Sequence, residues 1–146
     1  TRLEKHYLAV VHGKWPRRKQ HVDAPLVKNT LKSGERVSSV SAEGKSALTK
    51  ISVLEQSADY SLLAMQPVTG RTHQLRVHCQ HTGYPIVGDE KYGYEEQDAQ
   101  LKRLGVRRLM LHASRLVIPA DEPGEKTIRV EAPVDNSFKK MTEMIK

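Results

Sequence analysis

The sequence has very little of what stabilises secreted or membrane-bound proteins. It contains a single cysteine, Cys79, so no internal disulfide can form and a reducing compartment, the cytoplasm, is expected. No apolar run approaches the ~20 residues needed to cross a bilayer, so no membrane partner is expected. Residues 1–5 are polar and unlike a signal peptide. We therefore expect a cytoplasmic protein, and we expect it to be a monomer.

Motifs for nucleotides and metals are also missing. Gly44-Lys45-Ser46 looks like the end of a phosphate-binding loop, but that motif needs a glycine five positions earlier, where the chain has Ser39. No dinucleotide fingerprint or nucleophile-elbow serine occurs either. The one cluster of candidate metal ligands comprises His73, His78, Cys79 and His81. On a helix, positions 73 and 78 lie about 140° apart, so four inward ligands are geometrically poor. We expect no cofactor and no metal.

Positive charge is what the chain has in excess. Its 146 residues contain 24 Lys and Arg against 17 Asp and Glu, a formal net charge of +7. Such an excess favours polyanionic partners through phosphate neutralisation and counterion release. It does not choose among DNA, RNA and acidic membranes. The length is that of one domain, or of a large piece of one.

Apolar periodicity changes along the chain between a strand-like and a helix-like pattern. Strands are expected at 5–11, 47–56, 60–68, 109–118 and 125–132, with short ones at 36–40 and 85–87. Helices are expected at 72–82, at 95–104 and after a cap at Asp135 or Asn136; the rest of 22–46 is read as irregular. Thr69 or Thr72 is expected to cap the first helix, and Gly83 to end it. Hairpin-type connections favour an α+β domain with a mixed, mostly antiparallel sheet and a few helices.

A basic loop follows the first expected strand. It consists of Lys14, Trp15, Pro16, Arg17, Arg18 and Lys19. Cations beside an aromatic ring suit phosphate contacts combined with base stacking. A solvated basic loop with Trp15 folded onto the domain explains the composition equally well.

The segment from Pro67 to His78 carries the strongest local signal. Gly70 lets the chain turn sharply out of a strand, and the free amides at the start of the next helix form an anion site. Arg71, Thr72 and His73 cluster at this turn, and Arg76 lies one helical turn deeper, where it would face a cleft. The alternative is a well-capped surface helix with ordinary arginines.

Five segments, in order, resemble motifs of the RluA-type pseudouridine synthases. They are residues 5–13 (K-x-Y-x-A-x-V-x-G), 44–49 (G-K-x-A-x-T), 67–78 (P-x-T-G-R-T-H-Q-I/L-R-V-H), 83–92 (G-x-P-I/L-x-G-D-x-x-Y) and 111–116 (L-H-A-x-x-L). The matches span nearly the whole chain. Within the family, the sequence is most similar to members that modify large-subunit (23S) ribosomal RNA.

The resemblance implies an activity and a set of site residues. The activity is isomerisation of specific uridines in RNA, in which a glycosidic C–N bond is broken and a C–C bond is formed without a cofactor. The resemblance implies that Tyr7 packs on the target base, that Leu111 lines the base pocket, and that Arg76 pairs with the catalytic aspartate. RNA contacts are expected from a wider set: Lys14, Trp15, Arg17, Arg18, Lys19, Arg71, Thr72, His73, Gln74, His112 and Arg115.

The chain departs from the family pattern in one respect. It contains no H-R-L-D-x-x-T-S-G motif, which carries the family's nucleophilic aspartate, and Asp89 in the G-D-x-x-Y segment is expected to be structural. Because that motif precedes the Tyr7 strand in the family, we expect residues 1–146 to be the C-terminal portion of a single catalytic domain, inactive by itself. The alternatives are a non-catalytic RNA-binding module on the same scaffold and a DNA-binding protein.

Overall fold

The computed structural model describes residues 3–145. Its strands are β1 (Glu4–His12), β2 (His21–Asp23), β3 (Leu26–Thr30), β4 (Arg36–Val40), β5 (Leu48–Gln56), β6 (Tyr60–Pro67), β7 (Leu111–Ile118) and β8 (Ile128–Glu131), and its helices are α1 (Gln74–Thr82), α2 (Glu95–Arg103) and α3 (Asn136–Glu143). Six strands form one sheet in the order β2-β5-β6-β1-β7-β8, and β3 pairs with β4. All of these neighbouring pairs are antiparallel. The α+β expectation is confirmed.

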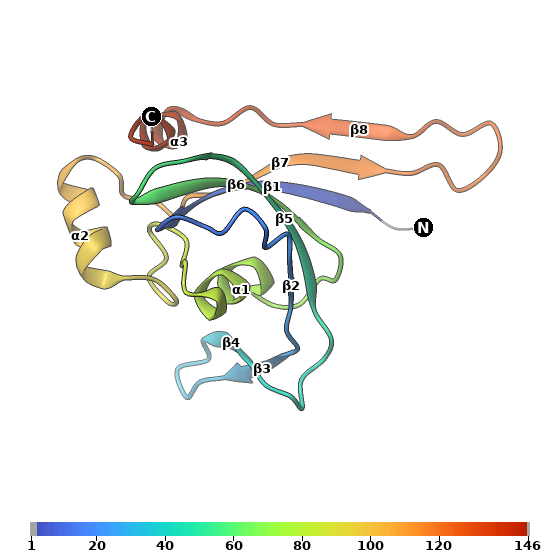
Figure 1. The fold of residues 1–146 in the computed structure, drawn as a ribbon. Helices are drawn as coiled ribbons and strands as arrows, with labels where there is room; N and C mark the ends of the chain where they lie inside the picture. Colours follow the sequence, from blue (N-terminus) through green and yellow to red (C-terminus); the bar gives the residue numbers. More distant parts are fainter. Residues whose placement is uncertain (1–2, 146) are drawn as a thin grey trace.

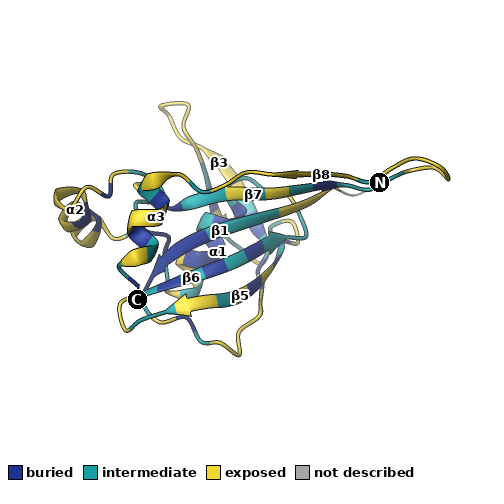
Figure 2. Cartoon of the chain, turned by 90° about the horizontal axis from the view of Figure 1, so that it is seen from above, coloured by how far each residue is buried: buried dark blue, intermediate teal, exposed yellow. Residues whose placement is uncertain are grey.

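The sheet is covered on both faces. Figures 1 and 2 show α1 and the β3–β4 hairpin on one face and α3 on the other. Ala9, Val10 and Val11 of the central strand β1 are therefore all fully buried. A strand buried on both faces has a continuous apolar run rather than an alternating pattern, which is why residues 5–11 stand out in the sequence.

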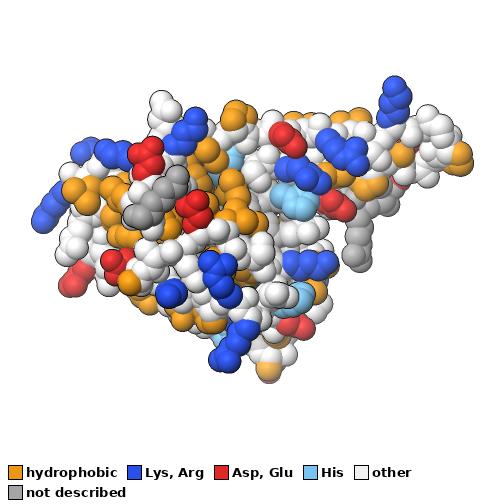
Figure 3. Space-filling model, turned by 45° about the horizontal axis from the view of Figure 1, so that its top comes forward, with side chains coloured by type: hydrophobic (Ala, Val, Ile, Leu, Met, Phe, Trp, Pro, Cys, Tyr) orange, Lys and Arg blue, Asp and Glu red, His pale blue; other side chains and the backbone are white. Residues whose placement is uncertain are grey.

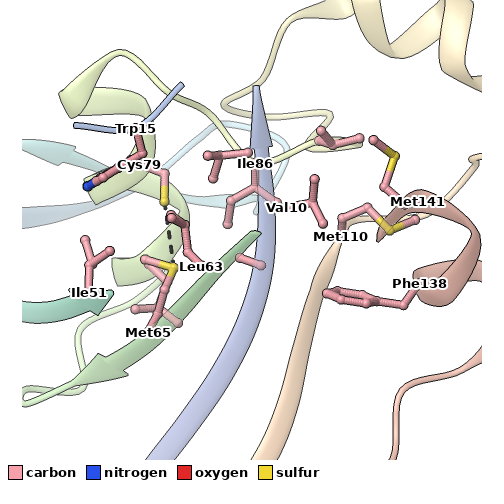
Figure 4. Close-up of a cluster of buried hydrophobic side chains, with 14 of the residues drawn as sticks. Val10, Trp15, Ile51, Leu63, Met65, Cys79, Ile86, Met110, Phe138 and Met141 are labelled. Atoms are coloured by element: carbon pink, nitrogen blue, oxygen red, sulfur yellow. Dashed lines mark hydrogen bonds between the residues drawn. The ribbon is translucent and has the colours of Figure 1, made fainter. Parts of the chain in front are cut away.

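The two faces of β1 bury two groups of side chains (Figure 4). Cys79 of α1 lies against Met65 of β6, with sulfur atoms 3.9 Å apart, on one face. Phe138 and Met141 of α3 pack near Val10 on the other face. Within residues 3–145, no helix has the length and apolar character that crossing a membrane requires.

Several expected boundaries need correction. The stretch read as irregular contains two further strands, β2 and β3. Residues 85–87 do not form a strand, although Ile86 makes an isolated bridge to Val11. β8 is shorter than expected and is exposed at every position, as Figure 2 shows. The short strands were missed because each buries a single residue, Val22 in β2 and Leu26 in β3, which leaves no periodicity to detect.

The helix ends agree with the sequence at Gly83 and Asp135 but not at the start of α1. Asp135 caps α3 by accepting a hydrogen bond from the Phe138 amide at 2.9 Å. Gly83 ends α1 in the left-handed conformation, and Gly105, just after α2, is also left-handed. Neither expected threonine caps α1. The cap position is His73, which makes no side-chain capping bond.

Candidate active site

A cleft of about 520 Å³ opens between the first half of β1 and the turn that leads from β6 into α1. Its lining residues are Leu3, Lys5, Tyr7, Pro67, Val68, Thr69, Gly70, Arg71, His73, Gln74, Leu75, Arg76 and Leu111. Three of them are cations, and no carboxylate is present among these lining residues. The cleft is therefore lined by a mixture of apolar, polar and basic side chains.

The cleft brings together the three residues that the sequence singled out for the chemistry. Tyr7 comes from β1, Arg76 from α1 and Leu111 from β7. Ala9 pairs with Leu111 and Tyr7 pairs with Ala113, so the Tyr7 and Leu111 side chains project from the same face of the sheet. A register shift between His6 and Tyr7 adds a bulge beside the cleft, and such bulges re-aim neighbouring side chains.

Arg76 is held by a carboxylate beneath it, Asp89. Its Nε and Nη2 donate to the two Asp89 oxygens at 2.9 and 2.8 Å, and its guanidinium lies 5.2 Å from the centre of the Tyr92 ring. Nη1 has no hydrogen-bond partner within residues 3–145. Sequence reasoning gave Arg76 a different partner, the aspartate of an absent motif. The structure shows that Asp89 binds the edge of the guanidinium formed by Nε and Nη2, and that Nη1 on the other edge remains available to a second acceptor.

Asp89 is fully buried and fully bonded. Its side chain is 0% exposed, and besides Arg76 it accepts hydrogen bonds from the amides of Lys91 and Tyr92, both at 3.0 Å. Burial alone would raise the pKa of Asp89, but the bonds from Arg76 and the two amides outweigh it and lower the pKa. The hydrogen bond to Asp89 in turn raises the pKa of Arg76. The pair is therefore ionised on both sides.

His73 has the one positive φ found among the described non-glycine residues, at 53°. Its Nδ1 lies 2.8 Å from the Tyr92 hydroxyl, which itself accepts a hydrogen bond from the Ser38 amide at 2.9 Å. Burial, then the charges of Arg76 and Lys91, lowers the pKa of His73, so the imidazole is neutral near pH 7. The Tyr92 hydroxyl then donates to Nδ1. This network explains how the strained turn is held.

Gln74 lines the cleft and was expected to contact RNA, which stays a prediction, while its side chain is bonded within the protein. The residue is 4% exposed, and its amide nitrogen donates to the Leu48 carbonyl at 2.9 Å and to the Thr49 hydroxyl at 3.0 Å. Its oxygen accepts from the Thr69 hydroxyl at 2.6 Å and from the Arg71 amide at 3.2 Å. The Gln74 side chain therefore stabilises the turn before α1 by linking it to the start of β5.

Trp15 needs correction as a stacking residue. It is 1% exposed, its indole nitrogen donates to the Lys19 carbonyl at 2.9 Å, and its ring lies 5.5 Å from that of Tyr84. A base cannot reach a ring in this position. Of the two interpretations of the basic loop, folding of the tryptophan onto the domain is the one that the structure shows.

The other expected RNA contacts lie apart from the cleft. Lys14, Arg17, Arg18 and Lys19 are exposed on the loop that leaves the far end of β1. His112 bonds to the Ala132 carbonyl at 2.9 Å, and neither it nor Arg115 lines the cleft. At about 3.3 Å per residue, Tyr7 is roughly 16 Å from the last residue of β1. RNA contacts at these positions stay predictions.

Three of the residues expected to contact RNA lie at the cleft instead: Arg71 and His73 line it, and Thr72 lies between them in the sequence.

Positive charge by itself does not locate a binding surface. Figure 3 shows Lys and Arg side chains spread over the face drawn rather than gathered in one patch. No group of three or more His, Cys, Asp or Glu is arranged to hold a metal ion in the part of the chain that the structure describes. Geometry around the cleft, rather than net charge, has to identify the site.

Comparison with known proteins gives consistent matches. Residues 1–81 match the family model described as RNA pseudouridylate synthase. The chain is 47% identical over 137 residues to ribosomal large subunit pseudouridine synthase C of Yersinia pestis, covering 94% of this chain and 42% of the relative. It is 45% identical over 146 residues to the protein of that name from Salmonella typhimurium, covering 99% and 46%.

A solved structure agrees with these sequence matches. Human RNA Pseudouridylate Synthase Domain Containing 4 superposes with a TM-score of 0.72 and 26% identity, over 98% of this chain and 62% of that one. The chain spans less than half the length of the two bacterial relatives that it matches.

Proposed function

This chain belongs to the RNA pseudouridylate synthase family, and we propose that its protein isomerises specific uridines of large-subunit ribosomal RNA to pseudouridine. The single observation that carries the proposal is the cleft in which Tyr7, Leu111 and Arg76 meet from three separate elements. Family membership and the names of the bacterial relatives support the reaction and the RNA class. We also propose that the protein acts as a monomer in the cytoplasm.

Tyr7 and Leu111 would receive the base. A uridine inside folded RNA is stacked, so eversion costs a few kcal/mol before chemistry can begin. An aromatic ring offsets about 1–3 kcal/mol of the lost stacking, and an apolar neighbour excludes water from the glycosidic bond. Both side chains project from one face of the sheet into the cleft, as this role requires.

Arg76 would hold the reacting carboxylate. The isomerisation needs a carboxylate as nucleophile or base, and a guanidinium beside it keeps it ionised and oriented. Nε and Nη2 are already bonded to Asp89, so the second carboxylate would bind at Nη1. We propose that sequence outside residues 1–146 supplies this carboxylate and that these residues alone do not isomerise uridine. The length of the bacterial relatives supports this division.

The test uses the protein expressed from its complete gene. Deleting the gene should remove specific pseudouridines from a map of cellular ribosomal RNA, and re-expression should restore them. Tyr7→Ala and Arg76→Ala should each lower kcat by about 100-fold, the loss of roughly 2.7 kcal/mol of transition-state stabilisation, with RNA affinity changed far less. Tyr7→Phe keeps the ring and should retain more activity than Tyr7→Ala.

Two outcomes would count against the proposal. Unchanged turnover in both alanine variants would remove the assignment of the cleft. An unchanged pseudouridine map after gene deletion, combined with tight RNA binding by the purified protein, would favour the alternative of a non-catalytic RNA-binding module. The same proteins should be compared on structured RNA and duplex DNA at matched salt, because a preference for DNA would contradict both ideas.

A further inference from the structure

A second groove of about 490 Å³ adjoins the cleft at the turn before α1. Gly70 and Arg71 line both hollows, so the two are neighbours at this turn. Lys28 of β3 and Lys45 of the loop before β5 line the new groove, and Glu43 is the one acidic residue in its described lining. With Arg71 the groove therefore carries three cations against one carboxylate, directly beside the site proposed for the base.

The position of Lys45 is built into the backbone. Lys45 and Leu26 exchange two backbone hydrogen bonds, each 2.9 Å long, which fasten the loop to the start of β3. A Cβ at Gly44 would come within 2.5 Å of the Leu26 carbonyl group, so this close approach requires glycine. The Gly44-Lys45-Ser46 segment, which fails as a nucleotide-binding loop, thus presents a lysine at a fixed place in the groove.

The two walls of the groove are fastened to each other. The Ser38 hydroxyl of β4 donates to the Thr72 carbonyl at 2.7 Å, which ties the hairpin to the turn before α1. Arg71 Nε donates to the Ser46 carbonyl at 2.9 Å, which holds the guanidinium at the junction of groove and cleft. A preorganised groove of this kind loses little conformational freedom when an anion binds.

We propose that this groove binds the RNA backbone next to the everted uridine, with Lys28 and Lys45 contacting phosphates and Arg71 contacting the phosphate at the junction. The inference rests on the proposed function and names its path for the substrate. A nucleotide turned into the cleft leaves its flanking phosphates at the cleft mouth, where the groove begins. The loop at residues 14–19 leaves the opposite end of β1 and can reach only more distant parts of the RNA.

The experiment compares two double variants of the protein expressed from its complete gene. Lys28→Gln with Lys45→Gln removes two charges from the groove, and Arg103→Gln with Lys139→Gln removes two from α2 and α3. The probe is a fluorescent twelve-nucleotide oligouridylate, followed by anisotropy over a series of KCl concentrations. Urea unfolding of both variants should match the parent, since all four side chains are exposed.

The groove variant should raise Kd about tenfold and make the slope of log K against log salt shallower by roughly 1.4, at about 0.7 per single-strand phosphate contact. The control should keep both values near those of the parent. At saturating RNA the groove variant should retain kcat, because neither lysine lines the base cleft. An unchanged slope, or equal losses in the control, would overturn the proposal.

Two further measurements distinguish RNA binding in the groove from general anion binding, and failure of this proposal from failure of the proposed function. If the groove variant loses binding to polyglutamate as strongly as to RNA, the surface is a general anion site and the assignment to the RNA backbone is wrong. Pseudouridine formation by the parent is measured separately. If the unsubstituted protein makes no pseudouridine, the proposed function is wrong. The Kd for RNA and its salt dependence in the two double variants still decide whether the groove binds RNA.

Discussion

Replacing Asp89 by asparagine would show whether the buried carboxylate sets the position of Arg76. One oxygen, Oδ1, accepts from Arg76 Nη2 and from the amides of Lys91 and Tyr92, while Oδ2 accepts from Arg76 Nε. An asparagine that keeps Oδ1 in place would turn its amino group toward Nε, so that two donors face each other. One charge-assisted bond is lost, and the guanidinium has no counter-charge beneath it.

The size of the effect follows from this geometry. Removing one partner of a buried ion pair costs about 3–5 kcal/mol, but Arg76 is 18% exposed and can recruit water. Three of the four bonds to residue 89 also survive. We therefore expect Asp89→Asn to lower the free energy of unfolding by about 2–3 kcal/mol. A loss under about 0.5 kcal/mol would refute this account of the pair.

The activity readout separates positioning from mere stability. With Arg76 free to rotate, kcat should fall by about 100-fold while the Kd for RNA stays within about threefold. Met141→Ala is the matched control, because it should cost about 2–4 kcal/mol from the opposite face of the sheet and leave kcat intact. Equal kcat losses in the two variants, or near-normal kcat in Asp89→Asn, would show that Asp89 does not position Arg76.

The same variant has a pH signature. The folded-state pKa of Asp89 is lowered, so its contribution to stability is present above the unfolded value of about 3.9 and is lost as the pH falls through the folded value. Asp89→Asn should therefore show a shallower loss of stability below about pH 4 than the parent. Parallel acid-unfolding curves would contradict the ion pair.

Two further predictions concern the framework around the site. Gly44→Ala should lower the free energy of unfolding by about 2 kcal/mol or more, because the added Cβ meets the Leu26 backbone, whereas Gly70→Ala, with open space around it, should stay within about 0.5 kcal/mol in the same urea titration. His78 is fully buried, bonded at Nδ1 to the Thr49 hydroxyl at 2.8 Å, and its pKa is lowered by burial. Its neutral form is therefore stabilising above the unfolded pKa of about 6.5, and that contribution declines as the pH falls from there toward the lower folded value, so the parent should lose stability between pH 7 and 5 more steeply than His78→Gln. Identical slopes in the two proteins would remove His78 as the titrating group.

Much of the fold could be predicted because its central elements carry strong local patterns. The continuous apolar run of β1, the alternation in β5 and the caps at Gly83 and Asp135 report directly on burial and backbone conformation. β2 and β3 are different, since Val22 and Leu26 are each the one buried position of a short strand. A single buried residue has no periodicity, so no local pattern marks these strands.

The site was predictable only in part, because sequence motifs do not say which groups bond to each other. Tyr7, Arg76 and Leu111 were found by resemblance, and the structure places them in one cleft. The roles of Gln74 and Trp15 were missed because the same amide or indole suits RNA or the interior, and only the packing decides. Lys28 was not singled out at all. It lies on a strand that the sequence did not show, beside a loop distant in sequence.

The arrangement around residue 76 explains why an arginine is suited to this position. A lysine would offer a compact charge on a flexible stem, whereas a guanidinium presents five donors in a rigid plane. In this structure two nitrogens of Arg76 face Asp89, while Nη1 has no protein partner within residues 3–145. A single side chain can thus be anchored by one carboxylate and still bind a second. The buried Asp89 therefore serves the cleft indirectly, because it fixes the plane in which the remaining donors of Arg76 lie.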